Sequence, residues 1–275
     1  MKKKYSVLMS VYAKENPGFL TESIESMLNQ TIKTDDFVIV KDGELTAELD
    51  NIIEKYYFLN PNIFNIISLS ENLGLGKALD IGINHCKNEL VARMDSDDIS
   101  LPIRCELQLN EFEKDPELCI VGTNISEFYD NVDNIVSERV VPSSNEEIIK
   151  FMRRRSPFNH PTVMMKKSKV IQVGGYGVMK RKQDLDLFSR MINNNCKAKN
   201  IPNSLLLFRS NEDNFIRRKS WSYCSSYISV QYQILMRKHC TIIDFLYVLV
   251  GQLFIYLAPM WLLKKISNKF LRKLK

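Results

Sequence analysis

The sequence predicts an α/β fold with a doubly wound, mostly parallel central sheet, and three observations support this prediction. Short apolar runs typical of buried strands alternate with segments of helical periodicity between residues 5 and 94. Three carboxylates follow the fourth apolar run directly, within residues 91–98 (VARMDSDD). The chain has 275 residues, 45% of them hydrophobic, which is enough for one large domain with an appendage. Because strand and helix alternate, right-handed crossovers should make this sheet parallel.

Four strands and three helices account for the first part of the chain. The strands are expected at residues 5–11, 37–40, 64–69 and 90–94. The first helix should begin at Pro17, because Asn16 is a favoured N-cap residue and proline is favoured at the first helical position. A second helix should end at Asn60 before Pro61, and a third should follow residues 72–77 (NLGLGK).

The pattern changes after the carboxylates. Helices are expected at residues 102–114, 146–155 and 167–173, and from Asp184 onward. Strands are expected at residues 119–125, 135–141 and 162–165. Glycine and proline are sparse, and no low-complexity linker or internal repeat is present. We therefore expect one domain over residues 1–210 and a helical C-terminal region with a membrane anchor over residues 211–275.

Cysteine usage and charge narrow the functional classes. The six cysteines form no Cys-x-x-Cys pair and follow no secretory signal, so neither a zinc site nor a disulfide framework is indicated and a reducing cytoplasm is expected. The formal net charge is +6, but six basic residues lie together after residue 263. A basic end behind an apolar run favours an anionic membrane surface over nucleic acid as a partner.

Asp95, Asp97 and Asp98 have the composition of a cation site. They follow a predicted buried strand, at the sheet edge where open α/β sheets bind ligands. Hard divalent cations such as Mg²⁺ prefer oxygen ligands and bind through one or two carboxylates plus substrate phosphates. The cluster therefore indicates a site for a metal and a diphosphate. The alternative is a solvated acidic turn that caps the next helix.

Two familiar nucleotide-binding motifs are missing. Residues 9–15 (MSVYAKE), after the first strand, lack the glycine fingerprint of a dinucleotide-binding unit. Gly74 and Gly76 are too few for a phosphate-binding loop and favour a turn. Asp42 nevertheless ends the second strand, so several acids should gather with the carboxylate cluster at one sheet edge.

Four segments, in this order and spacing, resemble family 2 glycosyltransferases: residues 6–12 (SVLMSVY), 40–43 (VKDG), 72–79 (NLGLGKAL) and 92–98 (ARMDSDD). The resemblance covers residues 5–210 and is strongest to bacterial enzymes of exopolysaccharide, capsule and O-antigen synthesis. It implies a GT-A fold, a nucleotide-diphosphate sugar donor, expected to be a UDP-sugar, a divalent metal (Mn²⁺ or Mg²⁺) and inversion at the anomeric carbon. It also implies a lipid-linked or polysaccharide-precursor acceptor, for which a polyprenyl-diphosphate-linked glycan is expected.

The resemblance carries donor-binding roles onto individual residues. Tyr12 and Glu15 match the loop that touches the nucleoside. Asp42 matches the acid that hydrogen-bonds the base, and Lys77 matches a basic position near the nucleotide.

The carboxylate cluster matches the Asp-x-Asp motif of the family. Asp95 is expected toward the ribose and Asp97 toward the metal, with Asp98 supporting the site. Such a metal would stabilise the charge on the leaving diphosphate as the glycosidic bond breaks.

Inversion requires a general base that takes a proton from the acceptor hydroxyl. In the family this base is the aspartate of a Glu-Asp pair that begins a helix, after a Gly-Gly-Tyr. Residues 174–176 (GGY) and 183–186 (QDLD) match this pattern, so Asp184 is the expected base and Asp186 the second candidate. Gln183 replaces the usual glutamate. Alternatively, Asp184 only caps its helix, an interaction worth about 1 kcal/mol.

Further basic residues are expected near the site. His160 precedes a predicted strand and could face the donor or the acceptor, although a lone histidine is more often structural. Arg209, Arg217 and Arg218 follow the last predicted strand and resemble a basic segment that reaches the diphosphate. The Gln-x-x-Arg-Trp of processive synthases is absent, which favours transfer of a single sugar.

Residues 245–263 contain no charged side chain and approach the roughly 20 residues that a spanning helix needs. The run holds three aromatic residues of the kind favoured at membrane interfaces: Tyr247, Tyr256 and Trp261. A full span would place the lysine-rich end outside, against the positive-inside tendency, and Gly251 and Pro259 would break or bend it. We therefore expect a peripheral protein with a monotopic or re-entrant anchor at the cytoplasmic face of the cell membrane, with a helix at a dimer interface as the alternative.

Two other functional classes fit parts of the sequence. A haloacid-dehalogenase-like phosphotransferase also places Asp-x-Asp after a strand, but normally after the first one, whereas three strand–helix units come first here. A nucleotide-sugar-binding membrane protein that has lost its base is the non-enzymatic alternative, because Gln183 replaces a glutamate.

Overall fold

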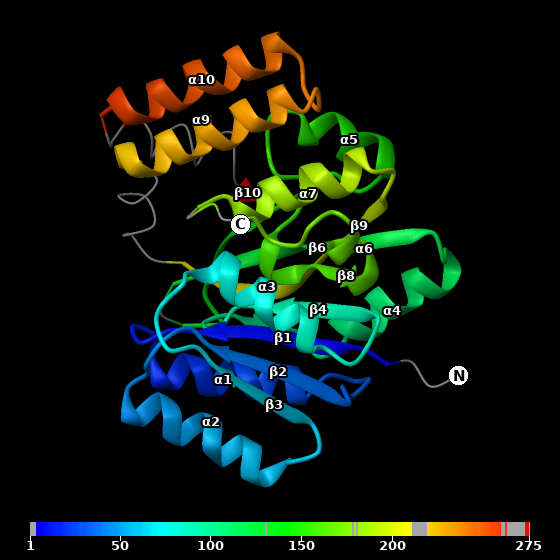
Figure 1. Ribbon diagram of the computed structural model, residues 1–275, viewed down its shortest axis with the longest axis vertical. Helices are drawn as coiled ribbons and strands as arrows, with labels where there is room; N and C mark the ends of the chain where they lie inside the picture. The colour runs from blue at the N-terminus through cyan, green and yellow to red at the C-terminus, as the bar shows by residue number, and fades with distance from the viewer. Residues whose placement is uncertain are drawn as a thin grey trace.

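The computed structural model describes residues 4–129, 131–177, 179, 181–210, 219–259, 262 and 273–274. Within these residues a ten-stranded sheet forms the centre, helices cover both of its faces, and a pair of C-terminal helices lies at one end (Figure 1). This architecture confirms the predicted α/β class.

The first part of the chain alternates strand and helix, as predicted. Its strands are β1 (Ser6–Val11), β2 (Asp36–Lys41), β3 (Phe64–Ser68) and β4 (Leu90–Met94). Its helices are α1 (Pro17–Leu28), α2 (Ala47–Leu59) and α3 (Leu75–His85). The four strands are parallel in the order β3-β2-β1-β4. The Asn16 side chain accepts hydrogen bonds from the backbone amides of Gly18 and Phe19, which explains why α1 begins where predicted.

The second part makes the sheet a mixed one. Its strands are β5 (Ile99–Ser100), β6 (Leu118–Phe128), β7 (Ile135–Arg139), β8 (Met164–Lys166) and β9 (Lys197–Arg209). Its helices are α4 (Arg104–Lys114), α5 (Asn145–Met152), α6 (Lys167–Gln172) and α7 (Gln183–Asn193). Strand β8 lies antiparallel between β4 and β6, and β9 is parallel to β6. The strand expected at residues 162–165 begins only at Met164, because a 3-10 turn that contains Pro161 precedes it.

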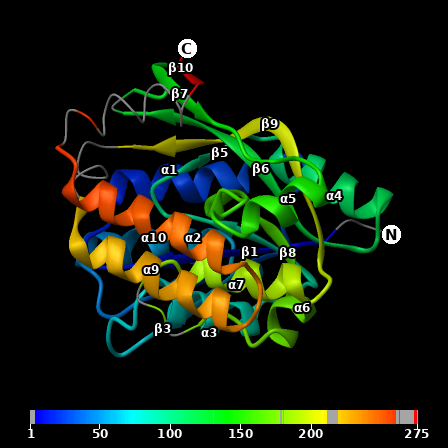
Figure 2. The ribbon, with the colours of Figure 1, turned by 90° about the horizontal axis from the view of Figure 1, so that it is seen from above.

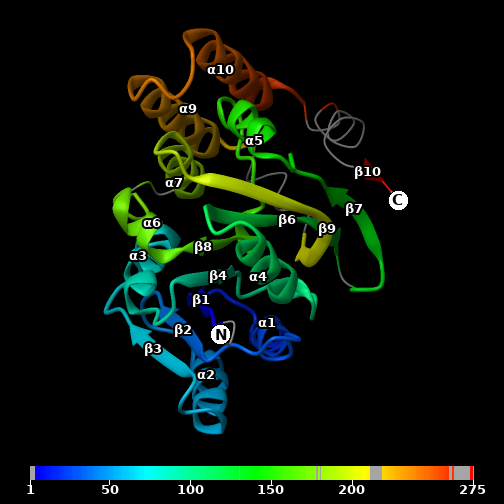
Figure 3. The same cartoon turned by 90° about the vertical axis from the view of Figure 1, so that its right-hand side faces the viewer.

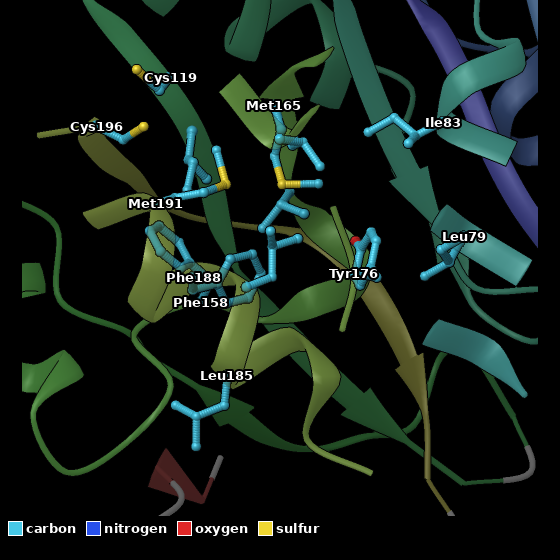
Figure 4. Packing of buried hydrophobic residues seen from close by; sticks show 14 of the residues in the cluster. Leu79, Ile83, Cys119, Phe158, Met165, Tyr176, Leu185, Phe188, Met191 and Cys196 are labelled. Atoms are coloured by element: carbon cyan, nitrogen blue, oxygen red, sulfur yellow. The ribbon is translucent and has the colours of Figure 1, made fainter. Parts of the chain in front are cut away.

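Two hydrophobic clusters, one on each face of the sheet, hold the layers together. Successive residues of β1 point to opposite faces, so Leu8 joins one cluster while Val7 and Met9 join the other. Helices α3, α6 and α7 cover the first face and α1 and α4 the second (Figure 3). In the first cluster, side chains of α3 and of α7 approach Met165 from opposite sides (Figure 4). Burial of both faces explains why the strands read as continuous apolar runs.

The C-terminal region adds helices α9 (Trp221–Met236) and α10 (Ile242–Leu257), which lie side by side (Figure 2). Helix α10 runs through Gly251, where a break or bend was expected, and ends before Pro259. Strand β10 (Lys273–Leu274) pairs with β7. None of the helices in the described ranges is both long enough and apolar enough to cross a membrane. Trp261 lies outside the described residues, and the division at residue 210 stays a prediction.

Candidate active site

The carboxyl ends of β1, β2 and β4 meet at one edge of the sheet, because these strands are parallel neighbours. This brings the loop after β1 to the carboxylate cluster. Ser96 Oγ donates a hydrogen bond to Glu15 Oε2 and so joins the two. Tyr12 lies in the same loop and is 45% exposed. The edge therefore offers an open surface beside a crowded acidic centre.

Three carboxylates crowd the end of β4. One oxygen from each of Asp95, Asp97 and Asp98 lies within 4.8 Å of the others. Asp98 is fully buried; its Oδ1 accepts a hydrogen bond from the backbone amide of Arg209 (2.9 Å), and its Oδ2 has no partner among the described residues. Burial, followed by repulsion from Asp95 and Glu15, raises the pKa of Asp97 to about 7. Crowded oxygens, one of them buried without a partner, fit a hard divalent cation.

Arg93 was not predicted from the sequence, although a charged residue inside an apolar strand is itself a signal. It is buried on β4 and forms an ion pair with Asp95 through NH2. Its Nε and NH1 have no hydrogen-bond acceptor in the described part of the chain. Such unsatisfied donors are costly unless a ligand adds an acceptor. Arg104, also buried, supports this residue by donating to the Arg93 backbone oxygen (2.9 Å).

Arg209 closes the site from the end of β9. Its Nε donates to the backbone oxygen of Asp97 (2.9 Å), and its guanidinium pairs with Glu22 of α1. The arginine therefore fixes the backbone of the cluster, consistent with the expectation that it lies near the diphosphate site. Arg217 and Arg218 lie outside the described residues.

Asp42 is buried, and the loop after β3 occupies its carboxylate. Oδ1 accepts a hydrogen bond from the amide of Leu73 (2.7 Å), and Oδ2 accepts one from the amide of Gly74 (3.0 Å). Asp42 thus fixes the position of this loop, and its contact with a nucleotide base stays a prediction. Lys77 is exposed at the start of α3, with Nζ 3.5 Å from Asp80 Oδ2.

Asp80 and Tyr176, neither of them predicted, fix the Gly-Gly-Tyr loop against α3. The Tyr176 amide donates to Asp80 Oδ1 (3.0 Å). Gly175 has a φ of +64°, and a Cβ there would lie 1.9 Å from Asp80 Oδ1, so only glycine fits. The Tyr176 hydroxyl lies 2.9 Å from His160 Nε2. Burial, helped by Arg93, lowers the pKa of His160 well below its usual range, so a neutral His160 positions Tyr176; contact of His160 with a substrate stays a prediction.

The two acids at the start of α7 differ in their contacts. Asp186 is buried, and its two carboxylate oxygens accept hydrogen bonds from Arg190 Nε (3.0 Å) and Arg237 NH1 (2.6 Å). The carboxylate of Asp184 is half-buried and has no hydrogen bond or ion pair within the ranges that the structure describes. The Asp186 carboxylate is therefore occupied by two arginines, whereas the Asp184 carboxylate remains available for proton transfer.

Tyr176 is buried, and charges from both acidic regions act on its hydroxyl. Burial raises the pKa of Tyr176; Arg93 opposes this increase, whereas the charges of Asp184 and Asp95 add to it. The carboxylate cluster therefore offers oxygen ligands for a cation, and Asp184 offers a carboxylate without an ion pair among the described residues.

Comparison with known proteins gives a consistent result. The family model described as Glycosyl transferase family 2 matches residues 6–188. The chain is 35% identical, over 98% of both proteins, to a UDP-Gal:alpha-D-GlcNAc-diphosphoundecaprenol beta-1,3-galactosyltransferase of Escherichia coli. It is 37% identical, over 82% of this chain and 84% of the relative, to the amylovoran biosynthesis glycosyltransferase AmsE of Erwinia amylovora.

Solved structures share the fold. TarS 1-349 of S. aureus in complex with UDP-GlcNAc has a TM-score of 0.64 at 16% identity, covering 97% of this chain and 76% of that chain. The mannosyltransferase PcManGT of Pyrobaculum calidifontis, in complex with GDP-Man and Mn2+, has a TM-score of 0.63 at 15% identity, covering 96% and 73%. These likenesses confirm the GT-A fold, and the family match excludes the haloacid-dehalogenase-like alternative. With the family model spanning residues 6–188 and a relative 35% identical over nearly the whole chain, the protein is a glycosyltransferase that belongs to family 2.

Proposed function

We propose that the chain transfers one sugar from a UDP-sugar to a polyprenyl-diphosphate-linked acceptor, with inversion at the anomeric carbon and with a divalent cation. The observation that carries this proposal is the cluster of three carboxylates at the end of β4, in which Asp98 Oδ2 is buried without a partner among the described residues. The E. coli relative, whose name includes UDP-Gal and a diphosphoundecaprenol-linked acceptor, supports both substrate classes.

The donor would bind at the edge formed by β1, β2 and β4. Asp97, supported by Asp98, would hold Mn²⁺ or Mg²⁺, which would neutralise charge on the leaving diphosphate, and Asp95 would lie toward the ribose. Tyr12 and Glu15 would contact the nucleoside. Asp42 would contact the base, and Lys77 would contact the nucleotide. The hydrogen bond from the Leu73 amide to Asp42 joins the two segments that carry these residues.

The acceptor would approach from the side of α7. Its hydroxyl oxygen forms the new bond to the anomeric carbon while the bond from that carbon to the diphosphate oxygen breaks. The Asp184 carboxylate takes the hydroxyl proton, and the UDP leaves as the anion. Attack on the face opposite the leaving group inverts the anomeric carbon.

Three components should be required together for product formation: a UDP-sugar, Mn²⁺ or Mg²⁺, and an acceptor sugar carried on a lipid diphosphate. A panel of UDP- and GDP-sugars, with nucleotide release and product mass as readouts, tests this expectation. We expect turnover with at least one UDP-sugar and its loss in excess chelator. Donor binding without turnover on any acceptor would instead favour the binding-only alternative that Gln183 raised.

The outward face of α10 supports attachment of the protein to the cytoplasmic face of the cell membrane. Its most exposed aliphatic residues are Ile242, Ile243, Leu246, Val250 and Leu257. Contiguous exposed apolar surface of this kind marks an interaction site, and an amphipathic helix can lie in the plane of a membrane interface. We infer a peripheral or monotopic mode of attachment through this face.

Charge on this face should weaken membrane attachment. The double variant Ile243→Glu/Val250→Glu places two carboxylates on side chains that are 69% and 64% exposed, so the fold should tolerate them. We expect markedly less protein to sediment with vesicles that contain anionic lipid. Phe58→Glu, at a 75% exposed position on α2, is the matched control and should sediment like the parent. Equal sedimentation of all three proteins would refute attachment through α10.

A further inference from the structure

A cavity of about 910 Å³ lies beside the start of α7, and the carboxylate cluster does not line it. Its walls come from the β6–β7 hairpin, from the end of α5 and from α9 and α10, which neighbour α5 in Figures 1 and 3. Binding pockets for small ligands measure about 300–1,000 Å³. The cavity is therefore large enough for part of a substrate that does not bind at the carboxylates.

Its lining is strongly basic. The cavity is lined by six basic side chains and three acidic ones. The basic residues are Arg139, Lys150, Arg153, Arg154, Arg155 and Lys182. Lys150 already places a positive charge in the last turn of α5, where it interacts favourably with the helix dipole. Three consecutive arginines follow at the C-terminal end of the same helix, so the positive charge there exceeds this one cation. The excess charge predicts an anionic occupant.

The three acids in the wall are already engaged. Asp244 pairs with Arg154 (2.6 Å). Glu147 accepts hydrogen bonds from the backbone at the start of α5, and Glu127 accepts one from Ser137. In the described part of the chain, Lys150, Arg153, Arg155 and Lys182 make no ion pair with a carboxylate. Among the described residues, four cations therefore line the cavity without an ion pair to a carboxylate.

A chain of contacts joins this basic cavity to Asp184. Lys182 is the residue before α7, and its Nζ lies 4.5 Å and 4.7 Å from the ring centroids of Tyr223 and Tyr227. The Tyr227 hydroxyl in turn donates to the backbone oxygen of Arg154 (3.3 Å). An anion in the cavity would thus lie near the cation two positions before Asp184.

Helix α10 contributes apolar as well as polar side chains to the cavity. Val248 and Ile255 of α10 line the cavity, whereas Ile243, Val250 and Leu257 of the same helix are exposed on its outward face. A ligand with an anionic head and an apolar chain could place its head among the arginines and let the chain follow α10 outward. Helix α10 would then contact both the anionic head and the apolar chain of such a ligand.

We propose that this cavity binds the diphosphate of the lipid-linked acceptor and so presents the acceptor hydroxyl to Asp184. The proposal rests on the proposed function. Guanidinium groups match phosphate oxygens with paired, charge-assisted hydrogen bonds. In a lipid-diphosphate acceptor with one sugar, a single ring separates the diphosphate from the reacting hydroxyl, so the two must occupy neighbouring sites, as Lys182 and Asp184 do.

The test compares three short-chain acceptors that share sugar and alkyl chain and carry a diphosphate, a monophosphate or no phosphate. The parent should prefer them in that order in kcat/KM. In the double variant Arg153→Gln/Arg155→Gln, KM for the diphosphate acceptor should rise roughly tenfold or more per arginine. KM for the phosphate-free acceptor and the affinity for UDP should stay at parent values.

Lys55→Gln/Lys169→Gln is the matched control, because it removes two positive charges from α2 and α6, away from the cavity, and should keep the preference. If the double variant misfolds, Lys150→Gln, at an exposed position, should give a smaller loss in the same direction. If a folded double variant keeps the parent's preference for the diphosphate acceptor, the cavity assignment is wrong. It is also wrong if the double variant loses affinity for UDP, or if its only defect is weaker binding to anionic phospholipid vesicles. If the parent itself uses none of the acceptors, the proposed function fails instead.

Discussion

Asp97→Asn is expected to abolish detectable sugar transfer while leaving the protein folded. Asp97 supplies one of three crowded carboxylates, and the substitution removes its charge at nearly constant shape. Electrostatic stabilisation of charge that develops at a leaving group contributes about 10²–10³-fold for a single donor, and more where a cation is lost with it. The measurement is UDP release at saturating donor and acceptor with Mn²⁺. Asp133→Asn, in the exposed turn between β6 and β7, is the control and should match the parent.

The same substitution should stabilise the fold at high pH. Burial and repulsion raise the pKa of Asp97 to about 7. Between the unfolded-state pKa of about 3.9 and the folded-state pKa, the carboxyl keeps its proton in the folded protein but loses it in the unfolded chain. Its contribution to the stability of the fold is therefore complete below a pH of about 3.9 and is lost as the pH rises toward 7. Asparagine cannot ionise, so the gain in Tm over the parent, measured in chelator, should be larger at pH 8 than at pH 5. Full activity, or a lower Tm than the parent at pH 8, would contradict the role of Asp97.

The first four strands and the acids that follow them could be predicted because the relevant signals are local. Buried parallel strands read as apolar runs, and Asn16 with Pro17 marks a helix start within two residues. Parallel neighbours also end at the same edge. That Asp42 and Asp95 both follow strands that end at this edge therefore needed no information beyond strand order.

Contacts between distant segments could not be predicted in this way. Arg237 reaches Asp186 across 51 positions, and the Tyr176 amide reaches Asp80 across 96. Neither pair leaves a periodic or spaced pattern in the chain. The basic cavity is a further case, because α5 and α10 form its walls only after the C-terminal helices pack on the sheet domain.

The paired substitutions Asp184→Asn and Asp186→Asn should have opposite effects on activity and stability. Asp184 makes no ion pair in the described part of the chain, so its replacement should leave Tm unchanged and cost transfer roughly 10²-fold or more through loss of the base. Asp186 pairs with Arg190 and Arg237. Its replacement should cost about 2 kcal/mol of stability, less than a fully buried pair because Arg237 is partly exposed.

Activity must be measured per folded molecule, well below the Tm of the Asp186 variant, because a destabilised protein loses activity without any catalytic defect. Under these conditions the Asp186 variant should transfer sugar at close to the parent rate. The Asp184 variant should lose transfer roughly 10²-fold or more, yet bind UDP and Mn²⁺ like the parent, since a base acts on the acceptor and not on the donor. If instead the Asp186 variant is folded but dead and the Asp184 variant is active, the base is Asp186, and its two arginines must then release it when the acceptor binds.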